Sequence, residues 1–94
     1  MKDEIEPSPA QLFLAAVGEQ VMIYREAVGL SHEGLASHTG LTAEQIDQLE
    51  HGWFDPTLKD MQAIALAVGV TVYELLDVAG TTLGIASSGS GSEI

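Results

Sequence analysis

The chain has 94 residues, of which 46% are hydrophobic, which suits one small domain with a modest core. It has no cysteine, which excludes disulfide bonds and thiolate metal sites, and no apolar run near the roughly 18 residues that a membrane span needs. Fourteen acidic residues stand against three Lys plus Arg, a formal net charge of −11, whereas nucleic-acid binders usually carry a basic face. The acidic first residues do not resemble a signal peptide, so we expect a cytoplasmic protein.

Five helices are predicted in chain order, over residues 9–28, 32–39, 43–51, 58–68 and 72–79. Each follows a residue whose hydroxyl can cap the first turn, and three of these residues begin a capping box. The caps are Ser8, Ser31, Thr42, Thr57 and Thr71. Each helix ends near a glycine, the residue favoured past a helix end: Gly29, Gly40, Gly52, Gly69 and Gly80. No β-alternation is present, so we expect an all-α fold.

The domain organisation follows from the flanks of these helices. Residues 1–8 are predicted to be a flexible acidic arm, and residues 9–80 the folded domain. Residues 81–94 include a run of serine and glycine at 87–92, which is typical of a flexible tail.

The first predicted helix is apolar around most of its circumference. Such a helix is buried on more than one side, and a domain of this size cannot bury it alone. A homodimer partner or another protein would cover it, unless the N-terminal extension folds back over it. Trp53 and Phe54, after the third helix, either cover the core or contact a partner. The fifth helix is a second candidate interface. The residues assigned to these surfaces are Leu12, Ala15, Met22, Ile23, Trp53, Phe54, Tyr73 and Leu76.

The second and third predicted helices flank Gly40. Ala36 is small enough to let the two helices cross closely, and apolar residues are placed to hold them together: Leu35, Leu41, Ile46 and Leu49. Two helices joined by a short turn that contains glycine are typical of a helix-turn-helix.

The wider order of residues resembles the phage-repressor, Cro-like (xenobiotic-response-element type) helix-turn-helix family from residue 18 to residue 76, with the motif at 32–51. The matching segments are Val17-Gly18 through Arg25, Val28-Gly29-Leu30-Ser31, Leu35-Ala36, Gly40-Leu41-Thr42, Ile46-x-x-Leu49-Glu50-x-Gly52, Pro56-Thr57-Leu58, Ala65-x-Ala67-Val68-Gly69-Val70 and Leu75-Leu76. The resemblance implies a compact five-helix lambda-repressor-like domain, here with an extended N-terminal helix.

The resemblance also implies roles for individual residues. In the family, the residues that match Arg25 and Glu50 form an internal ion pair, so both are assigned to the structure. The second helix of the motif enters the major groove, where Gln45 or Gln48 can pair with adenine and Glu44 can accept from cytosine. The residues expected at DNA are His32, Thr42, Ala43, Glu44, Gln45, Gln48 and Lys59.

The local charge departs from the family. Residues 31–60 hold six acidic residues and one Lys or Arg, Lys59, which is the single well-placed phosphate partner. Proteins that hold roughly 6–10 phosphates owe much of their affinity to such charges. The electrostatic attraction to DNA is therefore expected to be weak or repulsive.

Three hypotheses follow. The first, which the family pattern favours, is a transcriptional regulator that binds operator DNA as a dimer. The second is an acidic module with impaired DNA binding that acts on proteins, as a partner regulator, an antirepressor or a DNA mimic. The third is a salt-rich cytoplasm, which would explain the acidity alone. The histidines lack metal-ligand spacing and no nucleophile–base pair is visible, so we expect no cofactor, no metal and no enzyme.

Overall fold

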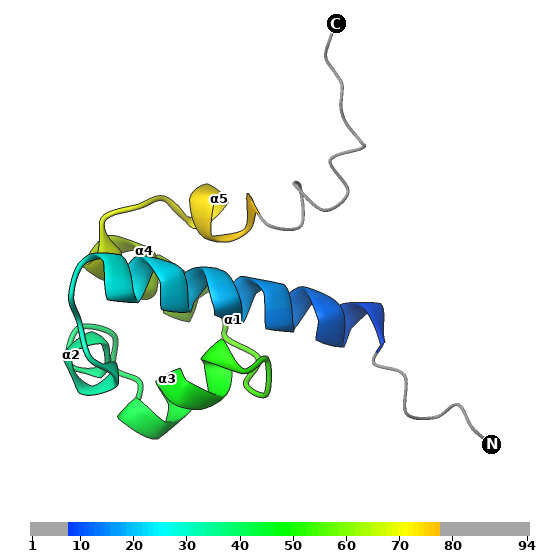
Figure 1. The fold of residues 1–94 in the computed structure, drawn as a ribbon, viewed down its shortest axis with the longest axis horizontal. Coiled ribbons are helices and arrows are strands. Elements are labelled where there is room, and N and C mark those ends of the chain that lie inside the picture. Colours follow the sequence, from blue (N-terminus) through cyan, green and yellow to red (C-terminus); the bar gives the residue numbers. More distant parts are fainter. Residues whose placement is uncertain (1–7, 78–94) are drawn as a thin grey trace, which may run out of the picture.

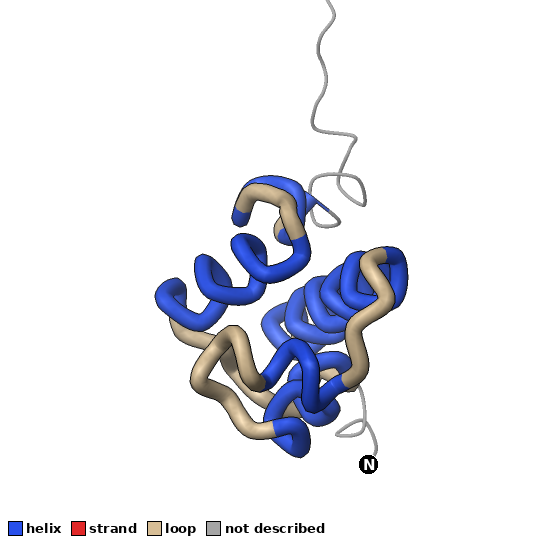
Figure 2. The backbone as a smooth tube through the Cα atoms, turned by 90° about the vertical axis from the view of Figure 1, so that its left-hand side faces the viewer, coloured by secondary structure: helices blue, strands red, loops and turns tan. Residues whose placement is uncertain are grey.

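The computed structural model describes residues 8–77, and five α-helices are present in that range. They are α1 (Pro9–Ala27), α2 (His32–Ala36), α3 (Ala43–Glu50), α4 (Leu58–Val68) and α5 (Val72–Leu75). This part of the chain contains no strand (Figure 2). The all-α prediction is confirmed. The predicted tail, Gly80 and all of the predicted arm except Ser8 lie outside the described residues.

The helices begin where the sequence predicts, because each N-cap hydroxyl accepts a hydrogen bond from a backbone N–H of its first turn. Four of the five caps form complete capping boxes. Asp60 completes the box that begins at Thr57, a residue that was predicted only as a cap. The helix starts are therefore encoded locally.

The end of α2 differs from the prediction, since the helix stops at Ala36 and not at residue 39. Beyond Ala36 the backbone N–H groups of His38 and Thr39 bond to carbonyls three residues back, which tightens the chain into a turn. The Ser37 hydroxyl also donates to the Gly34 carbonyl, at 2.8 Å. A helix with polar side chains competing for its carbonyls ends early.

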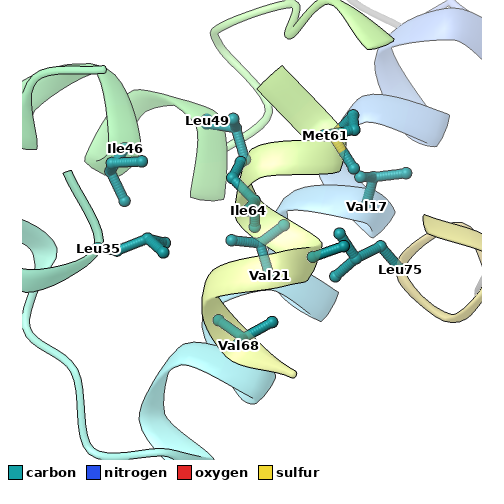
Figure 3. Close-up of a cluster of buried hydrophobic side chains, with 10 residues drawn as sticks. Val17, Val21, Leu35, Ile46, Leu49, Met61, Ile64, Val68 and Leu75 are labelled. Atoms are coloured by element: carbon teal, nitrogen blue, oxygen red, sulfur yellow. The ribbon is translucent and has the colours of Figure 1, made fainter. Parts of the chain in front are cut away.

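The helices pack around α1, which crosses the molecule with α2 and α3 on one side and α5 on the other (Figure 1). All five contribute side chains to one core (Figure 3). In α4 the buried residues recur at helical spacing, at Met61, Ile64, Ala65 and Val68. The rest of the core is Val17, Val21, Leu35, Ile46, Leu49 and Leu75.

The first helix buries only one stripe of its surface. Leu12 is 57% exposed and Ile23 is 49% exposed, and the first turns of α1 extend past the other helices (Figure 1). The apolar circumference expected from the sequence thus remains partly uncovered in the described chain. No helix among residues 8–77 is long and apolar enough to cross a membrane.

Candidate nucleic-acid interface

An ion pair joins the last turn of α1 to the last residue of α3. Arg25 Nε donates to Glu50 Oε2 at 2.6 Å, and Nη2 donates to Glu50 Oε1 at 3.1 Å. Arg25 Nη1 donates to the carbonyl of Leu30, at 2.8 Å. The Glu50 side chain is only 4% exposed, and the hydrogen bond with it raises the pKa of Arg25 above its usual value. The guanidinium thus fixes α1, α3 and the entry to α2, and serves the structure, as the sequence implied.

His32 joins the same network. Its Nε2 lies 3.0 Å from Glu50 Oε1 and 3.9 Å from Asp47 Oδ1, and its side chain is 37% exposed. The first residue of α2 is therefore tied to the end of α3, with one edge of its ring left accessible. The resemblance had assigned His32 to the neighbourhood of DNA. The structure adds an internal partner for one ring nitrogen.

An open groove of about 480 Å³ lies beside this network, between α1 and α3. Its lining combines apolar Ala15 and Met22 with four carboxylates, one guanidinium and two imidazoles. These charged and titratable residues are Glu19, Arg25, Glu26, His32, Asp47, Glu50 and His51. With neutral histidines, the groove carries three more negative than positive charges. A phosphate that approaches this side of α3 meets repulsion.

The outward face of α3 is formed by Glu44, Asp47, Gln48 and His51, which recur at intervals of three and four residues. The opposite face holds Ile46 and Leu49 in the core (Figure 3). Glu44 and His51 are exposed, and the other two are half-buried. This is the surface of the motif that is free to contact another molecule.

Gln45 lies off this face and performs a local task. Its Oε1 accepts from the backbone N–H of Thr42 at 2.9 Å, while Thr42 Oγ1 accepts from the Gln45 N–H at 3.0 Å. Both residues thus start α3. Ala43 is half-buried beside them, and Lys59 is exposed in the first turn of α4.

The capping role of Gln45 predicts a difference between two substitutions. Q45A removes one partner of the box and is expected to cost about 0.5–1 kcal/mol of unfolding free energy. Q45E keeps an acceptor at the position that capping boxes favour, so its stability is expected to remain within about 0.3 kcal/mol of the parent. Urea unfolding followed by circular dichroism measures both. Equal losses in the two variants would contradict the capping role.

Trp53 and Phe54 lie in different environments in the structure. Phe54 packs against the core, whereas Trp53 is 74% exposed and stacks on His51 with ring centroids 4.7 Å apart. Between them and α3 stands Gly52, with φ +80°, at a place where a Cβ would meet the backbone of Ala15. Covering the core is therefore the role of Phe54 alone.

Asp47 and His51 were not among the residues assigned to DNA from the sequence. The signal that identifies them is their spacing from Glu44, three and seven residues, which puts them on one helical face. Among the other assigned residues, Glu44 and Gln48 share this face. Lys59 and His32 come from neighbouring helices.

Two short helices packed in this way, with the second presenting a polar face, form a helix-turn-helix motif. A family model described as helix-turn-helix matches residues 21–75, more than half of the chain. The chain belongs to this family, of the Cro/C1 type. No curated protein matches the sequence significantly.

Solved structures agree with this assignment. The restriction-modification controller protein C.AhdI from Aeromonas hydrophila is 31% identical, with a TM-score of 0.64 over 66% of this chain and 94% of that one. The hypothetical transcription factor NHTF from Neisseria is 28% identical, with a TM-score of 0.65 over 76% and 82%. The clp gene regulator ClgR from Corynebacterium glutamicum, 22% identical, shares the fold with a TM-score of 0.73 over 84% and 82%. The three proteins are a controller protein, a hypothetical transcription factor and a gene regulator.

Proposed function

We propose that this protein is a transcriptional regulator that binds operator DNA as a dimer, with α3 in the major groove. The observation that carries the proposal is the outward face of α3, where Glu44 and Gln48 stand one helical turn apart on a helix held by the family's ion pair. Helix-turn-helix proteins read bases with this element. A glutamate can accept from the N4 amino group of cytosine, and a glutamine can bond to N6 and N7 of adenine.

Gln48 is assigned to adenine in preference to Gln45. A bidentate contact with adenine uses both the oxygen and the nitrogen of the amide. The oxygen of Gln45 already accepts from Thr42, so Gln45 would have to open its capping box in order to bind. Gln48 lies on the outward face and takes no part in a capping box.

The proposal is tested by selecting duplexes from a randomised pool at low salt and measuring their affinity by fluorescence anisotropy. Q48A is expected to lose about 1–3 kcal/mol of discrimination at one base pair, the usual value of a bidentate contact. Q45E, which is expected to retain the capping box and the fold, is the matched control and is expected to keep the selected sequence. If Q45E loses the sequence preference and Q48A keeps it, then Gln45, and not Gln48, is the residue that contacts adenine. If no sequence is enriched, DNA reading through α3 is wrong.

Phosphate contacts must come from few charges. Arg25 is engaged inside the domain, which leaves Lys59 as the exposed Lys or Arg among residues 8–77. Backbone N–H groups and polar side chains, among them Thr42 and His32, supply further contacts with phosphate oxygens. Ala43, at the start of α3, offers a methyl group for apolar contact with thymine. Binding is thus proposed to depend on shape and base contacts more than on charge.

The dimer is proposed from exposed apolar side chains. Leu66 on α4 is 84% exposed and Tyr73 on α5 is 86% exposed. A second set is formed by Trp53 together with four residues of α1, of which three are exposed, Leu12, Ala15 and Ile23, and one is half-buried, Met22. Phe54 and Leu76 pack against the core and are not expected to contribute. Analytical ultracentrifugation tests this proposal, and a protein that sediments as a monomer even at high concentration would rule out the dimer.

The acidic surface supports a second candidate, a module that binds proteins in place of DNA. The exposed Trp53 is of a residue type that is enriched at protein interfaces, and a net charge of −11 opposes binding to the phosphates of DNA. Pull-down from cell extract with and without nuclease separates the two functions, because DNA-mediated capture disappears with nuclease. Either function is proposed for the cytoplasm, and a salt-rich one would account for the acidity without bearing on DNA.

A further inference from the structure

The α1–α3 groove contains two histidines whose hydrogen bonds restrict what else they can contact. His32 Nε2 lies 3.0 Å from a carboxylate oxygen of Glu50, and His51 Nδ1 lies 2.8 Å from the carbonyl oxygen of Asp47. Both partners accept hydrogen bonds only, so each histidine donates there. A neutral imidazole has a single N–H. Its other nitrogen, Nδ1 of His32 and Nε2 of His51, then carries a lone pair.

A DNA phosphate oxygen also accepts only. It is therefore repelled by the lone pair of a neutral His32 or His51 and becomes a partner once the ring gains a second proton. Histidine is the side chain whose ordinary titration falls between pH 5 and 8. We propose that His32 and His51 supply phosphate contacts in their protonated form, so that operator binding by this protein takes up protons. The inference rests on the proposed function.

The position of the two rings suits that role. His51 lies on the outward face of α3, one turn beyond Gln48, and His32 begins α2. A helix-turn-helix places the first helix of the motif across the DNA backbone and the second in the groove. When bases contact Glu44 and Gln48, both rings therefore stand toward the flanking phosphates. Each is partly exposed, 37% for His32 and 53% for His51.

The two imidazole rings are surrounded mainly by carboxylates, so a proton on either ring also lowers the negative charge that repels phosphate. From α3, Asp47 lies 3.9 Å from His32 and 3.7 Å from His51, and Glu50 contacts His32. From α1, Glu19, Arg25 and Glu26 line the same groove, and no residue of α4 or α5 does. Protonation of both rings reduces the local charge from three negative to one negative. Repulsion of phosphate falls at the same step that creates the N–H donors.

The test is the affinity for the selected duplex at one fixed low salt concentration, between pH 8.0 and pH 5.5. We expect affinity to rise at least about 10-fold as the pH falls, since each linked proton changes affinity up to tenfold per pH unit. H51Q and H32Q keep one N–H donor but cannot titrate, so each is expected to flatten the profile. Calorimetry in buffers of different ionisation enthalpy is expected to count one to two protons taken up per protomer, and fewer in the variants.

His38 provides the matched control. It bonds through Nδ1 to the Gly34 carbonyl in the same way as His51 bonds to Asp47, but it lies outside the groove. H38Q is expected to keep the pH dependence. Two results would overturn the inference and leave the proposed function standing. One is specific binding by the parent protein with an affinity that does not depend on pH. The other is a pH dependence that is lost in H38Q but kept in H51Q. Absence of any sequence preference at every pH would overturn both. If H32Q fails to fold, H51Q decides.

Discussion

Replacing Arg25 with alanine is expected to cost about 3–5 kcal/mol of unfolding free energy, enough to unfold much of a domain this small. The substitution leaves the Glu50 carboxylate, 4% exposed, with His32 as its remaining side-chain partner. It also removes the donor to the Leu30 carbonyl. A buried charge that has lost its partner keeps its full desolvation penalty. Urea unfolding by circular dichroism is the measurement.

The control for this prediction removes both charges. The double variant R25M/E50L replaces the pair by apolar side chains of similar size, so it is expected to lose less than R25A alone. Glu26, 3.8 Å from Arg25 Nη2 and 64% exposed, provides a surface control, and E26Q is expected to stay within about 0.5 kcal/mol of the parent. A double variant that loses as much stability as R25A alone, or more, would show that the pair is not a coupled unit.

Gly18→Ala is expected to destabilise the protein by about 2 kcal/mol or more, although helix propensity alone predicts a gain of about 1 kcal/mol. The residue is buried in α1 where that helix crosses the end of α3. A Cβ there would meet the carbonyl oxygen of Leu49 and lie 2.7 Å from that of Glu50. Backbone atoms cannot move aside as a side chain can, so the helices would have to separate.

Gly34→Ala tests the same reasoning, but here the expected change in stability is neutral or favourable. A Cβ at Gly34 would meet the end of the Leu30 side chain, at 3.2 Å, which is able to shift. Alanine in α2 is therefore expected to be neutral or to stabilise by up to about 1 kcal/mol. Thermal unfolding of both variants checks the pair. Equal effects would show that helix propensity, and not contact across helices, determines the outcome at both positions.

The contrast between these glycines shows what the sequence could predict. Helix starts were predicted because caps such as Thr42 act within three residues. Of the core, only the residues that hold the second and third helices together were predicted, and three of them, Leu35, Ile46 and Leu49, are buried. The early end of α2 was not, because it depends on Ser37 competing for a carbonyl. The close approach at Gly18 depends on how two distant segments cross, which no local pattern records.

The candidate DNA-binding site was predicted only in part, because some of its contacts are not recorded in a local sequence pattern. The family pattern gave the ion pair of Arg25 and Glu50, which the structure contains. It could not distinguish Gln45, which caps, from Gln48, which faces outward, because that difference lies in one hydrogen bond. Nor could it show that Trp53 stacks on His51 and stays exposed, since both depend on the path of the loop after α3.

The central claim is that this acidic protein reads DNA with side chains on α3 while holding few phosphates by charge. The most direct test is the affinity for a selected duplex against salt concentration at about pH 7.5, with a scrambled duplex beside it. Among residues 8–77, Lys59 is the one Lys or Arg that is not engaged inside the domain, so its contribution from each protomer of a dimer gives an expected slope of about −2 in log affinity against log salt. Roughly 6–10 charged contacts would instead give about −5 to −9. A shallow slope with preference for the selected duplex agrees with the claim. Equal affinity for the two duplexes, or a steep slope, contradicts it.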